Sequence, residues 1–322
     1  MAKFNSPLAD HAEFLKVREG LEKRKGPAIL SGCIDSSKAY LVSEAGKSFD
    51  YQVVVTYNEV KAAEIASDLS CFLDEVLIYP SKDLLFYKAD VKGALLTKKR
   101  MEILRKIFEG EKIAIVLSIE SLLEKLAPNS KLASEVITIG NDSVVSITDL
   151  EKKLTRMGYE RFPEVDASGQ FAVRGGIIDI YPLAADDPVR IELFGDEVDS
   201  IRTFDLTTQR SISNIEEVTI FPGAEPKIDK LAVSFLEYLP ENTLVVLDEP
   251  ARLKEKAQAT AHEFHESATM RTTAGYENKD VELVTRTVIN HFYDKYITYP
   301  AAVKVHHEFG SGILHHSITM AE

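Results

Sequence analysis

Cysteine and long apolar runs are scarce in this sequence, and acidic residues outnumber basic ones. The chain has two cysteines, Cys33 and Cys71. Neither stands in a CxxC or Cys/His pattern, so we expect reduced thiols and neither a disulfide nor a metal site. No run of eighteen apolar residues occurs, and the first residues form no apolar signal segment. We therefore expect a cytoplasmic chain without a membrane partner.

Basic charge falls short of acidic charge, since 38 Lys and Arg against 51 Asp and Glu leave a net charge of −13. Nonspecific DNA binding depends on neutralising phosphates with lysine and arginine. We therefore expect DNA binding that is weak and salt-sensitive, or indirect. What the sequence does have is size and apolar content. Its 322 residues are 45% hydrophobic and 28% charged, which indicates a globular protein of two or three domains.

Up to about residue 150, short aliphatic runs alternate with amphipathic stretches. Such alternation predicts a parallel, doubly wound α/β sheet, so we assign 1–150 to the first part of an α/β domain. The expected strands are 27–32, 52–56, 76–79, 113–117 and 136–139, and the expected helices include 95–108 and 119–126. Asn58 can cap a further helix, whose apolar side we expect to be Val60, Ala63, Ile65, Ala66 and Leu69.

The next block, 151–222, changes character. After a helix over 149–157 come closely spaced strand-like runs, separated by turn pairs such as Gly175-Gly176 and Gly195-Asp196. This spacing predicts an inserted, mainly antiparallel α+β domain. Between residues 154 and 226 there are six arginines and no lysine.

The sequence then returns to the α/β pattern over 223–266. A helix is expected at 231–238, a buried strand at 243–247 and an amphipathic helix at 252–266. The remaining residues, 267–322, form a tail of uncertain structure.

The segment from Gly32 to Ala39 has the position and spacing of a phosphate-binding P-loop, GxxxxGK[ST], between a strand and a helix. A working loop needs a second glycine to wrap the phosphates, and a hydroxyl after the lysine to hold Mg²⁺. Ser37 replaces that glycine and Ala39 replaces that hydroxyl, on either side of the retained Lys38. We expect a strand-to-helix turn that has lost its ligand, and no cofactor. A usable nucleotide site is the alternative.

A second remnant is Asp248-Glu249-Pro250, which follows the strand at 243–247. A buried strand ending in Asp-Glu has the form of helicase motif II, in which Asp holds Mg²⁺ and Glu orients water. The plainer interpretation is a cap that opens the next helix. Two eroded motifs in the right order indicate a degenerate P-loop helicase-like domain whose chemistry is gone. We expect the chain not to be an enzyme.

Seven of the eight histidines lie from His262 onward. His262-Glu-Phe-His265 is one residue short of the zinc motif HExxH, so we expect no metal site there. The His-His pairs near the end can bind metal adventitiously.

The strand-like run 189–194 has one aliphatic face, residues 189, 191 and 193, which must be core. The other face carries Arg190, Glu192 and Phe194, and the run before Gly175 sends Arg174 outward by the same alternation. Arginine beside an aromatic side chain is typical of a binding face. We expect Arg190 and Phe194 to lie about 7 Å apart. The open alternative is that Phe194 tucks under a loop while the arginines pair with Asp196 or Glu197.

Four segments carry a resemblance to a known family. They are 157–161, 169–182, 190–202 and 204–211, and in this order they are similar to the UvrB-interaction-type domain of transcription-repair coupling factors. The excision-repair protein UvrB shares that domain and uses it to dock UvrA. The resemblance extends from about Pro7 to Phe264. The link from Phe86 to Leu95 is too short for the DNA-probing hairpin of UvrB itself.

The resemblance implies an adaptor that recruits UvrA through Arg174, Arg190 and Phe194. Complete members of the family add a domain that grips RNA polymerase, an ATP-dependent DNA translocase motor and a masking C-terminal domain. None of these parts is recognisable here, so RNA polymerase is expected as a partner only through the missing domain. An ATP-dependent helicase fragment and a non-functional truncated product are the other two hypotheses.

Overall fold

Two units make up the chain. The computed structural model divides it into a sheet unit, formed by Met1–Phe86, Glu109–Lys125 and Ser234–Glu322, and an inserted unit, formed by Tyr87–Phe108 and Leu126–Val233. The residues that the structure describes are 8, 11–25, 27–33, 35–82, 91–183, 185, 187–228, 231–273, 302–306 and 317–320.

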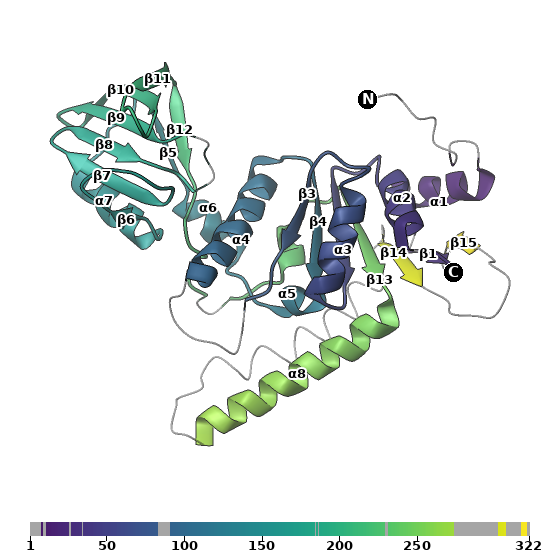
Figure 1. The fold of residues 1–322 in the computed structure, drawn as a ribbon. Helices are drawn as coiled ribbons and strands as arrows, with labels where there is room; N and C mark the ends of the chain where they lie inside the picture. The colour runs from purple at the N-terminus through teal and green to yellow at the C-terminus, as the bar shows by residue number, and fades with distance from the viewer. Residues whose placement is uncertain are drawn as a thin grey trace. The chain divides into compact units, whose positions relative to one another are not determined.

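The sheet unit contains a seven-stranded sheet in the order β15-β1-β14-β13-β2-β4-β3 (Figure 1). All neighbouring strands are parallel except β15, which runs antiparallel to β1. Its strands are β1 (Ala28–Ser31), β2 (Tyr51–Thr56), β3 (Val76–Tyr79), β4 (Ile113–Ser118), β13 (Thr243–Asp248), β14 (Ala302–His306) and β15 (Ser317–Met320). Its helices are α1 (Ala12–Glu22), α2 (Asp35–Ala45), α3 (Glu59–Leu69), α5 (Ile119–Leu123), the 3-10 turn η1 (Phe235–Tyr238) and α8 (Pro250–Thr273).

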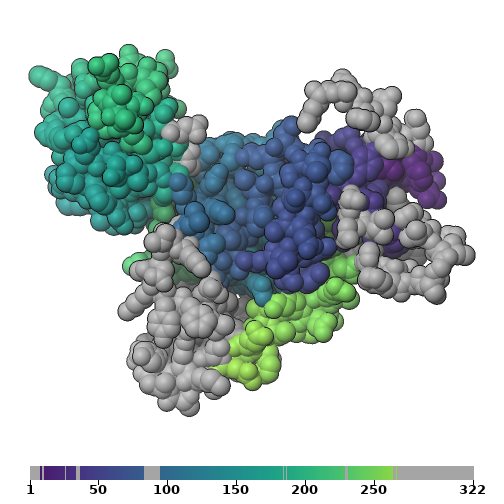
Figure 2. Space-filling model, in the orientation of Figure 1, coloured from purple at the N-terminus to yellow at the C-terminus, as the bar shows by residue number. Residues whose placement is uncertain are grey.

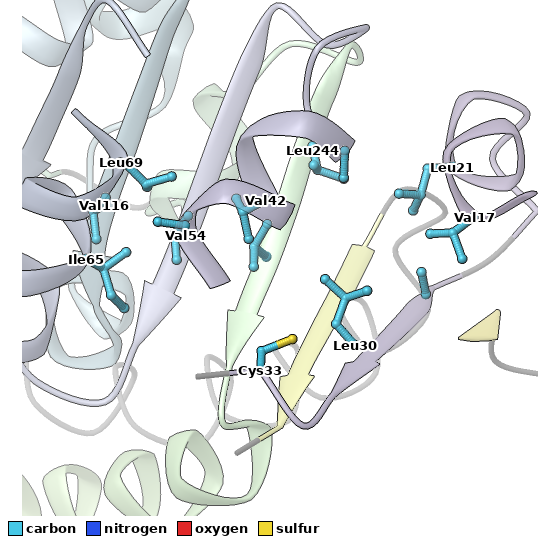
Figure 3. Close-up of a cluster of buried hydrophobic side chains, with 14 of the residues drawn as sticks. Val17, Leu21, Leu30, Cys33, Val42, Val54, Ile65, Leu69, Val116 and Leu244 are labelled. Carbon is cyan, nitrogen blue, oxygen red and sulfur yellow. The ribbon is translucent and has the colours of Figure 1, made fainter. Parts of the chain in front are cut away.

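Helices cover both faces of this sheet, which confirms the doubly wound prediction. Strands β2, β4 and β13 are buried at every position, as expected for central strands of a parallel sheet. On one face α1, α2 and α3 pack on the sheet through one hydrophobic core, which includes Val17, Val42 and Ile65 (Figure 3). On the other face α5 and α8 contact the sheet and each other.

Helix α3 begins as predicted but turns a different side inward. The side chain of Asn58 accepts a hydrogen bond from the Lys61 backbone N–H at 2.7 Å, which caps the helix. Ala62 is buried, whereas Val60 and Ala63 are exposed. Helical spacing groups Ala62 with Ile65, Ala66 and Leu69, so the expected inclusion of Val60 and Ala63 was wrong.

Two further expectations need correction. The helix expected at 231–238 is reduced to η1, which Ser234 and Glu237 cap and which ends at the extended residue Leu239. The residue before a proline is biased against helical backbone, and Pro240 comes next. The strand expected at 136–139 exists as β5 (Ile137–Gly140), but it pairs antiparallel with β12 (Glu217–Ile220) and is not part of the parallel sheet.

The inserted unit is built on a six-stranded sheet in the order β11-β10-β9-β8-β7-β6. All neighbours are antiparallel except β6 and β7. The strands are β6 (Glu160–Arg161), β7 (Gln170–Arg174), β8 (Ile177–Ile180), β9 (Val189–Phe194), β10 (Glu197–Phe204) and β11 (Ser211–Asn214). The helices of the unit are α4 (Val91–Glu109), α6 (Asn129–Glu135) and α7 (Ile147–Arg156). Glu109, the last residue of α4, belongs to the sheet unit.

One hydrophobic core holds the inserted unit together. Leu150 and Leu154 of α7 pack against the inner face of the sheet, represented by Ile178 and Ile191, and β5 and β12 add Ile139 and Ile220. Figure 2 shows the outer surface of this part of the chain in teal and green. The mainly antiparallel α+β fold predicted for 151–222 is therefore present.

The edges of the inserted unit differ from the expected division at 150 and 222. Residues 126–150 and 87–108 cluster with the inserted unit. For the segment that contains β5, the physical reason is that β5 pairs with β12 and shares its hydrophobic core. No helix within the described part of the chain is long and apolar enough to cross a membrane.

Candidate docking surface and remnant nucleotide site

The two faces of β9 differ in the way that the sequence predicts. Val189 and Ile191 are buried in the core of the inserted unit. Arg190, Glu192 and Phe194 lie on the opposite, outer face of the sheet. Arg190 has a register partner on each neighbouring strand. Asp179 of β8 lies opposite it on one side, and Arg202 of β10 lies opposite it on the other.

A buried carboxylate organises the outer face. Asp179 is only 1% exposed, and it accepts hydrogen bonds from Arg190 Nε at 2.7 Å and from Arg190 Nη2 at 2.9 Å. Arg174 Nη2 forms a short ion pair with the same carboxylate. Two guanidinium groups therefore share one buried acid, an arrangement that orients both of them.

Arg190 makes further contacts besides those with Asp179. Its guanidinium also donates to the backbone carbonyl of Gln209 at 3.3 Å and to the Gln209 side chain at 3.1 Å. It lies over the ring of the buried Phe204, 4.5 Å from the centroid. Hydrogen bonding to Asp179 raises the pKa of Arg190. The side chain is only 16% exposed, so Arg190 faces outward as predicted but is part of a network rather than freely displayed.

Phe194 behaves differently. It is 84% exposed, at the end of β9, where Gly195 takes a left-handed φ of 67° and lets the chain turn into β10. The expectation that Phe194 points outward is met, and the alternative that it tucks under a loop is not. Phe194 lies four residue steps along the strand from Arg190, about 13 Å, so the expected spacing of about 7 Å was wrong because it counted one residue pair instead of two.

Arg174 lies at the same end of the sheet as Phe194. It pairs with Ile177 across the β7–β8 hairpin, and Ile177 pairs with Glu192 of β9. Its side chain is 44% exposed, which leaves the guanidinium accessible. Arg174 and Phe194 thus stand beside neighbouring hairpin turns, whereas Arg190 lies deeper in the sheet.

Sequence reasoning missed the residues that hold the arginines. It considered Asp196 and Glu197 as ion-pair partners, but Asp179 takes that role, and Gln209 and Phe204 complete the network. A signal was present: Asp179 is an acidic residue between isoleucines in a strand. Because partners across strands depend on register, only the pairing of β8 with β9 identifies it.

The remnant nucleotide site is closed by an internal ion pair. Lys38 of α2 and Asp248 at the end of β13 form a short ion pair, with side chains 7% and 0% exposed. The hydroxyl of Thr56 donates to the other carboxylate oxygen at 2.8 Å. The structure therefore brings together the two eroded motifs that the sequence singled out, and each satisfies the charge of the other.

The neighbouring residues fit this closed state. Gly32 has a left-handed φ of 72° where β1 leaves the sheet. Ala39 is buried in the hydrophobic core of the sheet unit, and Ser37 precedes Lys38 in α2. The cavity beside Lys38 and Asp248 is lined mostly by aliphatic side chains and holds no more than about one water molecule.

Glu249 occupies the turn into α8. Its φ is 53°, and its carbonyl accepts from the Leu253 N–H at 3.0 Å, directly before Pro250 opens the helix. This geometry fits the helix-cap interpretation of Asp248-Glu249-Pro250.

The histidines give no metal centre among the described residues, where no group of three or more His, Cys, Asp or Glu is placed to hold an ion. His262 lies 3.5 Å from Glu266, one helical turn away. His307, His315 and His316 lie outside the described residues.

Comparison with known proteins identifies the domain that carries the outer face. Residues 137–225 match the family model of the UvrB interaction domain. They contain the whole six-stranded sheet, together with β5, β12 and α7. Residues 137–225 are a UvrB interaction domain.

Over most of its length the chain is similar to transcription-repair-coupling factors. It is 28% identical to the one from Bacillus subtilis (strain 168), over 86% of this chain and 29% of that protein. It is 32% identical to the one from Staphylococcus aureus (strain USA300), over 70% of this chain and 20% of that protein. The chain spans less than a third of the length of these relatives, and it matches their UvrB-like N-terminal region.

Proposed function

We propose that this chain is a protein-binding adaptor that recruits UvrA in transcription-coupled DNA repair. The observation that carries the proposal is Phe194, a phenylalanine 84% exposed at a hairpin turn of the UvrB interaction domain. When a partner covers a large apolar side chain that a strand holds in solvent, the free energy of binding becomes more favourable. The similarity to transcription-repair-coupling factors supports the same role.

The three candidate residues contribute unequally to this docking. Phe194 acts as the apolar anchor, and Arg174, 44% exposed, supplies an accessible guanidinium at the same end of the sheet. Arginine can fork onto a carboxylate of UvrA. Arg190 has a structural role in this surface, because its N–H groups bind Asp179 and Gln209 within the domain.

Replacing Phe194 with alanine tests the proposal. We expect UvrA binding to weaken roughly 30-fold, since a buried aromatic anchor is worth about 2 kcal/mol or more. The melting temperature should stay unchanged, because Phe194 is exposed in the free chain. Titration of purified UvrA by fluorescence anisotropy measures the first quantity and calorimetry the second.

The matched control is Ile212→Ala, which removes another exposed apolar side chain, 55% exposed on β11 of the same sheet. It should bind UvrA like the parent chain. A Phe194→Ala variant that stays folded and binds UvrA at full strength would contradict the proposed docking surface.

We also propose that the chain neither binds nor hydrolyses ATP. Ser37 and Ala39 remove the phosphate wrap and the Mg²⁺ hydroxyl, and Lys38 is paired with Asp248. Titration with labelled ATP and Mg²⁺ should give no saturable signal, and phosphate release should stay at background. Turnover that disappears in Lys38→Ala, assayed well below its melting temperature, would favour the helicase alternative. Cytoplasmic location and weak DNA binding stay predictions.

A further inference from the structure

A second exposed apolar side chain lies in the same strand row as Phe194. Val144, in the segment between β5 and α7, is 74% exposed. It forms an antiparallel bridge with Glu197 of β10, and Glu197 pairs in turn with Phe194 of β9. Residues directly opposite each other in antiparallel strands project from the same face of the sheet. Val144 and Phe194 therefore flank Glu197 on one face, about 10 Å apart at two strand spacings.

The position of Val144 is rigidly held. The Val145 N–H donates to the Asp196 carbonyl at 2.7 Å, and the Val198 N–H donates to the Ser143 carbonyl at 3.1 Å. The Ser143 hydroxyl oxygen accepts a hydrogen bond from the Gly140 N–H at 2.9 Å, which fixes the turn after β5. A side chain on a backbone that is hydrogen-bonded at the residues before and after it loses little freedom when a partner covers it.

Carboxylates surround the apolar pair. Glu197 lies between the two side chains, Asp196 belongs to the hairpin turn after Phe194, and Asp142 precedes the Val144 segment; all three are exposed. Arg190, by contrast, is about 13 Å from Phe194 along β9 and is bound within its own network. Two exposed apolar side chains, Phe194 and Val144, thus lie on either side of the exposed carboxylate of Glu197.

We propose that Val144 is a second apolar anchor for UvrA, so that the docking surface is centred on the Phe194–Glu197–Val144 row. The inference rests on the proposed function and adds residues to its surface. The complementary surface of UvrA should offer two apolar sockets about 10 Å apart, with basic side chains between and beside them. The position of Val144 in the same row as Phe194 and the acidic surroundings of both side chains select this partner and this chemistry.

The test compares three variants of the full chain: Val144→Asp, Phe194→Ala and the matched control Ile212→Asp. Val144→Asp should weaken UvrA binding at least 10-fold, because it places a carboxylate in an apolar socket. Ile212→Asp should leave affinity unchanged. Circular dichroism melts should be the same for all three, since each side chain is exposed. Should Val144→Asp melt early, Val144→Ala replaces it, with a threefold or larger loss expected.

The outcomes separate the inference from the proposed function. If Phe194→Ala loses affinity and the Val144 variants bind at full strength, the second anchor is overturned and the UvrA role stands. If Phe194→Ala and the Val144 variants all bind UvrA at full strength, the proposed docking surface fails as well. Glu197→Lys should also slow association with UvrA at low salt. Faster association would overturn the basic character assigned to the partner.

Discussion

The guanidinium of Arg190 donates to Asp179 and Gln209 within the inserted unit, while Phe194 on the same face of β9 projects into solvent. Alternation along the strand places both side chains on the same face, since both residues lie at even-numbered positions. Their difference comes from the neighbouring strands, because β8 supplies a buried acid opposite Arg190 and the chain turns at Gly195 beside Phe194. Arg190 therefore stabilises the fold, and Phe194 is available to a partner.

Truncating Arg190 should test this division. Arg190→Ala leaves the 1% exposed Asp179 with Arg174 as its remaining ion-pair partner. We expect a loss of about 2–3 kcal/mol in the free energy of unfolding, because an incompletely paired buried charge is costly. Urea denaturation followed by circular dichroism measures it.

Arg174→Ala is the matched comparison and should cost less, since its side chain is 44% exposed. Phe194→Ala should cost least of the three. An Arg190→Ala variant with unchanged stability would show that the network around Asp179 contributes nothing to folding, and would return Arg190 to the list of freely displayed anchors.

At the scale of secondary-structure elements, the Lys38–Asp248 pair joins α2 to the end of β13. In a working P-loop enzyme a lysine at this place serves phosphate, and the aspartate serves Mg²⁺. Here the two side chains are buried together and Thr56 of β2 binds the same carboxylate. Lys38, Asp248 and Thr56 thus form a structural contact between a helix and two strands.

Breaking this pair should destabilise the sheet unit. Lys38→Ala leaves Asp248 fully buried with the Thr56 hydroxyl as its remaining hydrogen-bond donor among the interactions above. We expect a loss of about 3 kcal/mol in unfolding free energy. The double variant Lys38→Met with Asp248→Asn removes both charges and should recover most of it, as measured by chemical denaturation. If the single and double variants are equally stable, the ion pair is not a structural contact.

At the scale of the whole molecule, the segment beyond residue 267 supplies a central strand of the parallel sheet. β14 lies between β1 and β13 and is parallel to both, with Val303 opposite Ala28 on one side and Val246 on the other. Without it, β1 and β13 would each present an open edge. Two described segments of the tail that the sequence pattern left undetermined, 302–306 and 317–320, are therefore strands of the seven-stranded sheet.

A proline at the centre of β14 should test this topology. Val303→Pro removes a backbone N–H from a strand paired on both sides, which is tolerated only at sheet edges. We expect a loss of about 3 kcal/mol or more, or aggregation, measured by thermal melts and size-exclusion chromatography. Val303→Thr keeps the N–H and the β-branched shape and should fold normally. Equal melting temperatures for the two variants would be inconsistent with a central position for β14.

Local patterns in the sequence determined much of this protein. Burial of β2, β4 and β13, the cap at Asn58 and the outward position of Phe194 follow from residue type and period, and the prediction that P-loop chemistry is absent rests on Ser37 and Ala39. Tertiary structure decided the rest. Asp179 as the partner of Arg190, β5 in a separate sheet, β14 at the centre of the parallel sheet and Val144 beside Phe194 all depend on pairing between distant strands. That pairing is set by register and packing across the molecule, which no short stretch of sequence contains.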